Sequence, residues 1–527
     1  MPKMKELEHL IAKTEIGRRD FMGRAAALGV STALATSMWS TSAKAAMGKR
    51  GGKLRQALTG GGTGDVLDPA QTLDSYMQNI SFGQLRNCLT EIGADGQLGG
   101  ELAESWEASA KADSWTFKLR KGVEFHNGKS LEAQDIIETF HHHMGEDSKS
   151  AAAGITKAIK EVKADDKHTV TFNLDGGSAD FPFLVSDYHL CVFPAGGKDF
   201  TQGTGGYSLV NFEPGVRTLT KRNPNYWKEN AAYFDEVESL FIADVNARTN
   251  ALKTDQVDVI ASPDAKTVNL LKRDPNVQIL KTDGNKQICL PMDTRVAPYD
   301  NNDVRLALKY AIDREQWLKT ILNGNGALGN DHPIGPANVY RNTGLAQRQY
   351  DPDKAKFHLK KAGMSNLKVK FQVADTAYGG AVDSGALYRE TASKCGIDME
   401  IVREPNDGYW SNVWMKKPFV ASYWGGRPTE DWIFSQVYSS GADWNESFWE
   451  HEKFNKILIE ARAELNADKR RGMYYEMQEI VHNEGGSVIP LFSSYMHALS
   501  TKIQLPDQVA GNWEFDGEKN AERWWFK

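Results

Sequence analysis

The sequence predicts an α/β protein built from two lobes. The first half of the chain alternates apolar and polar residues as strands do, whereas the second half spaces its apolar residues as amphipathic helices do. A chain of 527 residues has room for two or more domains, and its 40% hydrophobic and 25% charged residues are ordinary for a soluble globular protein. The change of period falls near residue 285, where we expect the boundary between the lobes.

The amino-terminal segment predicts an export signal rather than folded structure. The pair Arg18 and Arg19 is followed by Phe21, then by a modest apolar run and a small-x-small cleavage site that ends at Ala45. Paired arginines alone are common by chance, but these features in register are typical of twin-arginine signals. We therefore predict a signal peptide over residues 1–45 and a mature chain that is exported already folded.

The net charge and the position of the first cysteine indicate the compartment and exclude some classes of partner. Segment 1–45 carries seven Lys/Arg and four Asp/Glu, a net charge of +3, which leaves −9 for the mature chain from a total of −6. Such an acidic surface argues against nucleic acid and against anionic lipid as partners. No cysteine precedes Cys88, so no lipidated cysteine stands at the cleavage site. A periplasm is the expected compartment.

The four cysteines indicate no redox or zinc motif. They are Cys88, Cys191, Cys289 and Cys395, and their wide spacing excludes a CxxC pattern. An oxidising compartment permits disulfides, and four cysteines allow three pairings. The favoured interpretation is that they are buried thiols that pack as small hydrophobic side chains.

Individual strands are predicted in the first half of the chain. Trp115, Phe117 and Leu119 alternate with polar residues, which is the period of a half-buried strand, and residues 170–174 repeat the pattern. Gly-containing turns such as Asn127-Gly128 separate these segments.

Individual helices are predicted in the second half. Apolar residues keep helical spacing from Val304 to Leu322, and Asn323-Gly324 ends that helix. A second apolar helix face runs from Phe454 to Leu465. The sequence contains no evident internal repeat.

Motifs for catalysis and for metal binding find no support, so we expect no enzyme, no cofactor and no metal site. Residues 324–329 match GxGxxG, but they follow a helix, whereas a dinucleotide fold needs a strand before the motif and a helix after it. His141, His142 and His143 are consecutive, and successive helical side chains point about 100° apart, so they do not converge on one ion. A solvated helix end is the favoured interpretation of this run.

A cluster of tryptophans marks the most informative region. Six of the 14 tryptophans fall within forty residues: Trp410, Trp414, Trp424, Trp432, Trp444 and Trp449. Each could fill a hydrophobic core, and core is the favoured interpretation for Trp410, Trp414 and Trp449. Trp424, however, opens the loop-like segment 424–429, which contains two glycines and Arg427. Aromatic side chains beside an arginine in a loop favour a ligand pocket for these two residues.

Longer stretches resemble the peptide/opine/nickel family of periplasmic binding proteins, which includes oligopeptide and dipeptide binders. They run through nearly the whole mature chain, and together, in this order, they are specific. The stretches are LAESWE at 102–107, WTFKLRKGVEFHNG at 115–128, GTGGY at 203–207, NPNYW at 223–227, YAIDRE at 310–315 and YDPDKA at 350–355.

This resemblance implies a two-lobed periplasmic binding protein of type II, with three subdomains and lobe two spliced into lobe one. The expected divisions are lobe one over 46–284, lobe two over 285–490 and a return to lobe one over 491–527, with strand crossings near Asp283–Leu290 and Val488–Phe492. Within lobe one, we expect one subdomain of about 46–85 plus 201–284 and another of 86–200. The resemblance also implies a monomer that serves an importer with two membrane permease subunits and two ATPases.

The anchor that the family uses for its ligand is altered in this sequence. In the peptide binders a tryptophan is followed three residues later by an aspartate that pairs with the peptide's ammonium group. Trp424 matches the tryptophan, but Arg427 stands in the aspartate position. An arginine repels an ammonium group and can hold a carboxylate through two hydrogen bonds. Asp431 could still supply a negative group, so a zwitterionic ligand stays open.

The sequence therefore predicts the periplasmic solute-binding component of an ABC importer, with a small carboxylate-bearing ligand such as an opine, a modified amino acid or a short peptide. Capture of a nickel chelate and an exported enzyme are the alternatives, and the identity of the solute stays open. The candidate ligand-binding residues are Trp424, Gly425, Arg427, Asp431, Trp444, Asn445 and Tyr495.

Overall fold

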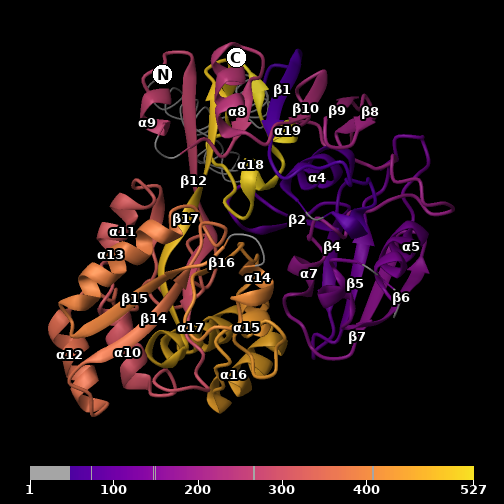
Figure 1. Cartoon of the computed structure of the whole chain (residues 1–527). Helices are drawn as coiled ribbons and strands as arrows, with labels where there is room; N and C mark the ends of the chain where they lie inside the picture. The colour runs from indigo at the N-terminus through magenta and orange to yellow at the C-terminus, as the bar shows by residue number, and fades with distance from the viewer. Residues whose placement is uncertain (1–47, 73, 146–147, 149, 265–266, 406–408) are drawn as a thin grey trace, which may run out of the picture.

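The computed structural model of the chain describes residues 48–527 except 73, 146–147, 149, 265–266 and 406–408. The predicted signal peptide lies outside the described residues. Figure 1 shows an upper part, a lower part in orange that is built from the middle of the chain, and a lower part in purple. Within the described ranges, no helix combines the length and the apolar character that a membrane crossing requires.

The largest sheet connects the upper part with the orange part. Among the described residues, its main path has the order β16-β12-β17-β11-β1-β10-β9-β8, and β13 pairs with β17. Strand β1 runs parallel to β10 and β11, whereas β17 runs antiparallel to its neighbours, so the sheet is mixed. The strands are β1 (Lys53–Leu58), β8 (Tyr207–Glu213), β9 (Arg217–Arg222), β10 (Glu236–Phe241), β11 (Val259–Ala261), β12 (Val277–Pro291), β13 (Gly326–Leu328), β16 (Ser422–Trp424) and β17 (Ser487–Ser500).

Two long antiparallel strands, β12 and β17, cross between the parts (Figure 1). Their pairing runs from Val277↔Ser500 to Pro291↔Ser487, with a register shift between Asp283 and Lys286. Such irregularities bend a strand and increase its twist. The divisions predicted at residues 285 and 490 fall inside these two strands. We call residues 292–486 lobe two and the remainder lobe one.

Lobe two is rich in helices, as its apolar spacing predicts, but one predicted helix is wrong. The expected helix over 304–322 is two helices, α10 (Asn302–Tyr310) and α11 (Arg314–Thr320). The side chain of Asp313 accepts a hydrogen bond from the backbone N–H of Gln316, which caps a new helix and ends the old one. The second predicted helix is confirmed as α16 (Glu452–Ala463).

The other elements of lobe two complete its two cores. A parallel pair, β14 with β15, carries one core, and α15 to α17 enclose the other. The elements are α12 (Pro352–Lys361), β14 (Leu367–Val373), α13 (Ala381–Ser393), β15 (Ile397–Arg403), α14 (Tyr409–Asn412), α15 (Glu430–Val437) and α17 (Ala467–Glu484).

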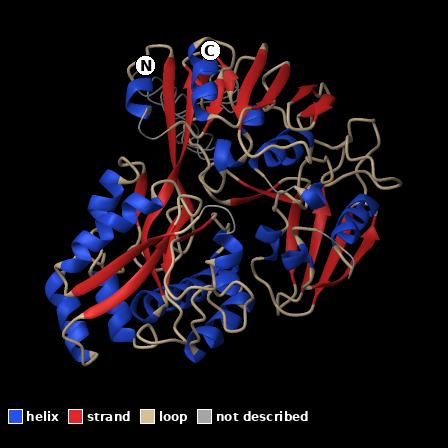
Figure 2. Ribbon diagram, viewed as in Figure 1, coloured by secondary structure: helices blue, strands red, loops and turns tan. Residues whose placement is uncertain are grey.

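The purple part of lobe one, here called the small subdomain, is built on the sheet β4-β5-β7-β6 (Figure 2). Its strand β5 confirms the strand predicted from Trp115, Phe117 and Leu119, all three of which are buried. The Phe117 ring meets the Phe172 ring of the neighbouring strand edge-on, with 5.5 Å between centroids. The elements are β4 (Ala103–Ala108), β5 (Ser114–Leu119), α5 (Ala133–His143), α6 (Ala153–Thr156), β6 (Ile159–Asp166), β7 (Thr169–Leu174) and α7 (Phe181–Leu184).

The upper part of lobe one, here called the large subdomain, unites segments from both ends of the described chain. Helix α4 and strand β1 pack there against residues that follow β17. The smaller elements are η1 (Pro69–Gln71), α4 (Ser75–Ile80), η2 (Ser81–Leu85), α8 (Val245–Lys253), α9 (Val268–Leu271), β18 (Ile503–Gln504), α18 (Glu514–Gly517), α19 (Asn520–Arg523) and β19 (Trp525–Phe526). A separate antiparallel pair, β2 (Thr90–Ile92) with β3 (Leu98–Gly100), contacts α7 and β4 of the small subdomain.

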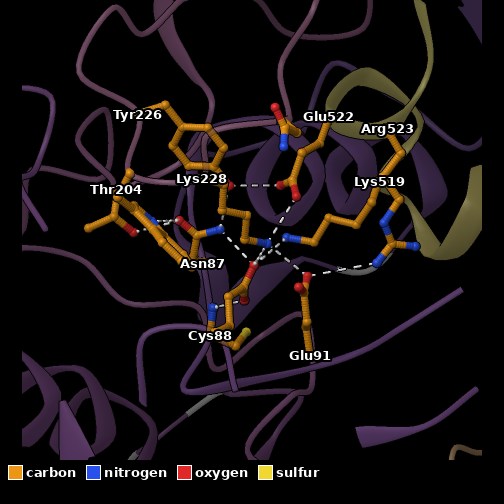
Figure 3. Close-up of polar contacts among 12 residues, drawn as sticks. Asn87, Cys88, Glu91, Thr204, Tyr226, Lys228, Lys519, Glu522 and Arg523 are labelled. Carbon is orange, nitrogen blue, oxygen red and sulfur yellow. Dashed lines mark hydrogen bonds and ion pairs between the residues drawn. The ribbon is translucent and has the colours of Figure 1, made fainter. Parts of the chain in front are cut away.

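A buried ion network joins these distant segments (Figure 3). The ammonium group of Lys228 lies 2.9–3.0 Å from carboxylates of Glu91, Glu101 and Glu522, and Lys519 lies 3.1 Å from Glu101. Glu101 is fully buried. Burial alone would raise the pKa of Glu101, but Lys228 and Lys519 hold it below its usual range. Because removing one partner would leave a buried charge uncompensated, the network fixes how these segments meet.

The cysteines and the histidine run have ordinary structural surroundings. All four cysteines lie in the described part of the chain, and each is a buried free thiol. At the end of α5, His142 pairs with Asp68 at 2.8 Å, whereas His143 bonds to Ser150 at 2.7 Å. The two imidazoles thus face different partners, and in the described ranges no group of three potential ligands could hold a metal ion.

Candidate functional site

A cavity of about 370 Å³ lies where both lobes and both subdomains meet. The large subdomain contributes residues around α4, the small subdomain contributes a segment after α7, and lobe two contributes the loop after β16. The crossing strands contribute one side chain each. The lining residues used below are Asp187, Tyr188, His189, Lys286, Tyr423, Gly425, Gly426, Arg427, Trp432, Gln436, Trp444, Tyr495, Trp513, Glu514 and Glu518.

The loop after β16 enters the cavity because small residues let it approach the crossing strands. Strand β16 pairs with β12 and ends at Trp424. A Cβ atom at Gly426 would lie 3.1 Å from the Cβ atom of Asn285 and 3.5 Å from the hydroxyl of Tyr495, so a larger residue would be crowded there. Thr429 then caps α15 by accepting a hydrogen bond from the backbone N–H of Trp432.

Arg427 is held in this loop as a cation without a carboxylate partner. Its Nε donates to Oε1 of Gln436 at 2.8 Å, and its guanidinium carbon lies 5.6 Å from the ring centroids of both Trp424 and Trp432. No carboxylate among the described residues forms an ion pair with it. Burial lowers the pKa of Arg427. The guanidinium is therefore oriented and partly desolvated, and it has a free capacity to bind an anion.

Three of the predicted site residues do not line this cavity: Asp431, Asn445 and Trp424. Asp431 lies in the first turn of α15 and pairs with Arg462 of α16 at 3.1 Å. Asn445 donates to the backbone carbonyls of Trp449 at 2.7 Å and of Ser439 at 3.3 Å, which stabilises its own loop. The side chains of Asp431 and Asn445 are thus occupied by structural contacts.

The other predicted residues are brought together. Gly425, Arg427, Trp444 and Tyr495 line the cavity. Trp424 lies behind Arg427 with 7% of its surface exposed, and its indole N–H donates to Oε1 of Glu446 at 3.0 Å.

The remaining tryptophans divide between core and surface. Trp449 is buried in the core of lobe two, and Trp414 packs against that core, as predicted. Trp410, which we expected in the core, is 38% exposed. The reason is that the neighbouring residue Tyr409 takes the inward position on α14, and successive helical residues point about 100° apart. Trp432, in contrast, lines the cavity and packs against the small subdomain.

Sequence reasoning missed several lining residues. Lys286 comes from β12, where its ammonium group lies 5.3 Å from the ring centroid of Tyr423. Glu514 and Glu518 come from the carboxyl-terminal segment, and Tyr188 comes from the small subdomain. Each is an ordinary residue in its own sequence surroundings, and only the tertiary fold brings it to the cavity.

Comparisons with known proteins agree with this architecture. The family described as bacterial extracellular solute-binding proteins, family 5 middle, matches residues 97–446. Heme-binding protein A of Haemophilus influenzae is 26% identical over 475 residues, which cover 83% of this chain and 86% of that protein. The dipeptide-binding protein of Escherichia coli is 24% identical over 490 residues, covering 84% and 90%. The structure of HbpA2 from Haemophilus parasuis covers 90% of this chain and 100% of that chain at 21% identity, with a TM-score of 0.80.

Proposed function

Because the chain belongs to family 5 of the bacterial extracellular solute-binding proteins, we propose that it is the periplasmic binding component of an ABC importer and that it captures a small carboxylate-bearing solute. The cavity between the lobes is the proposed binding site. Its size suits a small molecule rather than a long polymer. The protein would deliver its solute to membrane permease subunits that are driven by ATPases, and it would perform no chemistry itself.

The state of Arg427 is the observation that carries the ligand class. Arg427 is partly desolvated and donates its Nε–H to Gln436, yet it has no carboxylate partner among the described residues, so it is prepared to receive one. Asp431 could have neutralised it, but Asp431 is paired with Arg462 instead. The proposed ligands are therefore opines, modified amino acids and short peptides, all of which carry a carboxylate.

The proposed site comprises the four predicted residues that line the cavity, Gly425, Arg427, Trp444 and Tyr495, with Trp424 packed against Arg427 as its support. We add Lys286 because its ammonium group faces the same cavity. The aromatic side chains would stack on the apolar portion of a solute, while the two cations would hold its negative group.

The decisive experiment replaces Arg427 after native mass spectrometry has identified the solute that is retained on purification. Truncating one side of a buried charge pair costs on the order of 2–5 kcal/mol. Arg427→Ala should therefore weaken binding roughly 30-fold to several thousand-fold in calorimetry. Arg427→Lys should recover only part of the affinity, because an ammonium group lacks the planar fork.

A matched control removes an arginine outside the cavity. Arg471 on α17 forms an ion pair with Asp468 on the surface of lobe two, so Arg471→Ala should leave the affinity unchanged. A loss of less than about threefold in Arg427→Ala, with folding intact, would place the anchor elsewhere.

A further inference from the structure

The cavity has an acidic side as well as a basic one. Its three lining carboxylates are Asp187, Glu514 and Glu518. Asp187 is already engaged, because its Oδ1 accepts from Nδ1 of His189 at 2.6 Å. Among the described residues, neither of the other two carboxylates forms an ion pair with a lysine, an arginine or a histidine.

Glu514 is the less satisfied of these two carboxylates. Its Oε1 accepts only a long hydrogen bond from the hydroxyl of Ser262, at 3.5 Å. Its Oε2 is enclosed and has no hydrogen-bond partner within the described part of the chain. Glu518 is 1% exposed, and its Oε2 accepts from the amide of Asn79 at 3.1 Å. An enclosed carboxylate oxygen without a partner is costly, so the Oε2 of Glu514 indicates a missing donor.

The turn that carries both glutamates is rigid. Residues 515–518 all have positive φ angles between 49° and 66°, which L-residues other than glycine rarely adopt. The carboxylate of Asp516 holds this turn: it accepts from the backbone N–H of Ala510 at 2.7 Å, from Arg523 at 3.0 Å and from the indole of Trp524 at 3.2 Å. The backbone that carries the two glutamates is therefore held in place at the cavity wall.

Tyr495 lines the same cavity as Glu514, Glu518 and Arg427. Burial raises the pKa of its phenol, Glu514 and Glu518 raise it further, and Arg427 opposes them. Burial also raises the pKa of Glu514, and burial together with the charge of Glu514 raises the pKa of Glu518 well above its usual range. The charge of Lys286 acts on Glu514 in the opposite direction, but the two groups form no ion pair.

We propose that Glu514, supported by Glu518, is a second recognition site that binds a cationic group of the solute, so that the ligand is dipolar. This inference rests on the proposed function, because it takes the same cavity and the same solute. An ammonium group would donate to the unpartnered Oε2 of Glu514, while the carboxylate of the solute would meet Arg427, which lobe two contributes to the same cavity. Glu514 would thus supply a negative charge to the cavity, in place of the aspartate that the peptide binders carry where this chain has Arg427.

The test uses matched small molecules in place of the natural solute. The probes are free amino acids, dipeptides and opines, each compared with a des-amino analogue, in which hydrogen replaces the ammonium group, and with a carboxamide, in which the carboxylate is neutral. Binding is measured by calorimetry to the mature protein, to Glu514→Gln and to Glu479→Gln. The last variant removes an exposed carboxylate of α17 outside the cavity and controls for net charge.

The expected result is a preference for the dipolar probes that depends on Glu514. Wild-type protein and Glu479→Gln should bind a free probe at least about tenfold more tightly than its des-amino analogue. In Glu514→Gln the two affinities should become similar, because the free probe loses affinity while the des-amino analogue retains it. That retained affinity also shows that the variant is folded.

Other results overturn one proposal or both. Equal binding of free and des-amino probes, or an unchanged preference in Glu514→Gln, would refute the cationic site and leave the carboxylate anchor standing. Equal binding of free probes and carboxamides would refute the carboxylate anchor and leave the cationic site standing. A protein that binds none of the probes would refute both.

Discussion

Asp180 and Arg470 form a buried ion pair between the two lobes, with 2.5 Å between Oδ1 and Nη2. Asp180 immediately precedes α7 in the small subdomain, and Arg470 lies on α17 of lobe two. The side chains are 3% and 5% exposed, and the backbone N–H of Ala179 donates to the carbonyl of Arg462 beside them, at 2.6 Å. The contact holds the lobes together independently of the cavity.

Asp180→Asn should shift the protein toward an open arrangement. The substitution leaves Arg470 as an uncompensated buried charge in the closed form, at a cost of about 3–5 kcal/mol, whereas opening would hydrate it. We expect a larger radius of gyration for the ligand-free variant in small-angle scattering. Solute affinity should fall as well, because fewer molecules are in the closed form.

The exposed pair of Arg471 with Asp468 on the same helix supplies the control. Asp468→Asn should change stability by less than about 1 kcal/mol and leave the radius of gyration unaltered. An Asp180→Asn protein that matches wild type in both scattering and affinity would show that the pair does not govern closure.

Local sequence patterns predicted local elements well. Trp115, Phe117 and Leu119 predicted β5 because the alternation itself decides which face is buried. The break between α10 and α11 was missed because apolar spacing continues across it while a single side chain, Asp313, caps the second helix. A local hydrogen bond there outweighs a pattern that favours one continuous helix.

A second prediction concerns His497, which supports the turn at Glu514. The side chain is 1% exposed, and its Nε2 accepts from the backbone N–H of Phe515 at 3.2 Å. Burial lowers the pKa of His497 to about 3, below the ordinary value of 6.5. The pKa of His497 is lower in the folded protein than in the unfolded chain. Its neutral imidazole therefore contributes fully to the free energy of unfolding above pH 6.5, and this contribution is lost progressively as the pH falls from 6.5 toward 3.

His497→Gln removes this titration and keeps a side-chain acceptor. Wild type should lose about 1.4 kcal/mol of unfolding free energy per pH unit from this residue between pH 6 and pH 4. The difference in stability between wild type and His497→Gln should therefore shrink at that rate, as measured by urea unfolding at a series of pH values. Parallel curves for the two proteins would contradict the assignment.

A third prediction concerns export. Arg18→Lys combined with Arg19→Lys should leave the uncleaved precursor in the cytoplasm, because the paired arginines are the recognition feature of the proposed twin-arginine signal. In the wild type, the mature protein should begin at about Ala46. Cell fractionation and amino-terminal sequencing check both statements, and normal export of the double variant would exclude this route.

The candidate site was most readily predictable where its residues are neighbours in sequence, although Trp444 and Tyr495, which lie farther along the chain, were also predicted and line the cavity. Trp424, Gly425 and Arg427 belong to one loop, and their chemistry is visible together. Lys286, Gln436 and Glu514 reach the cavity through strand pairing, a helix turn and a left-handed turn, none of which marks them in the sequence. Asp431 was chosen for its closeness to Arg427 along the chain, but the orientation of α15 turns it toward Arg462.

The ion network around Lys228 also sets the order in which the molecule can mature during synthesis. Glu101 must wait for Lys519, which is made 418 residues later, before its buried charge is fully compensated. Lobe two draws mainly on contacts within residues 292–486, so it can reach its folded state while the ribosome is still at work. Lobe one is the first lobe to be synthesised and the last to complete its folding. A nascent chain therefore carries an incomplete lobe one until its carboxyl-terminal segment has emerged from the ribosome.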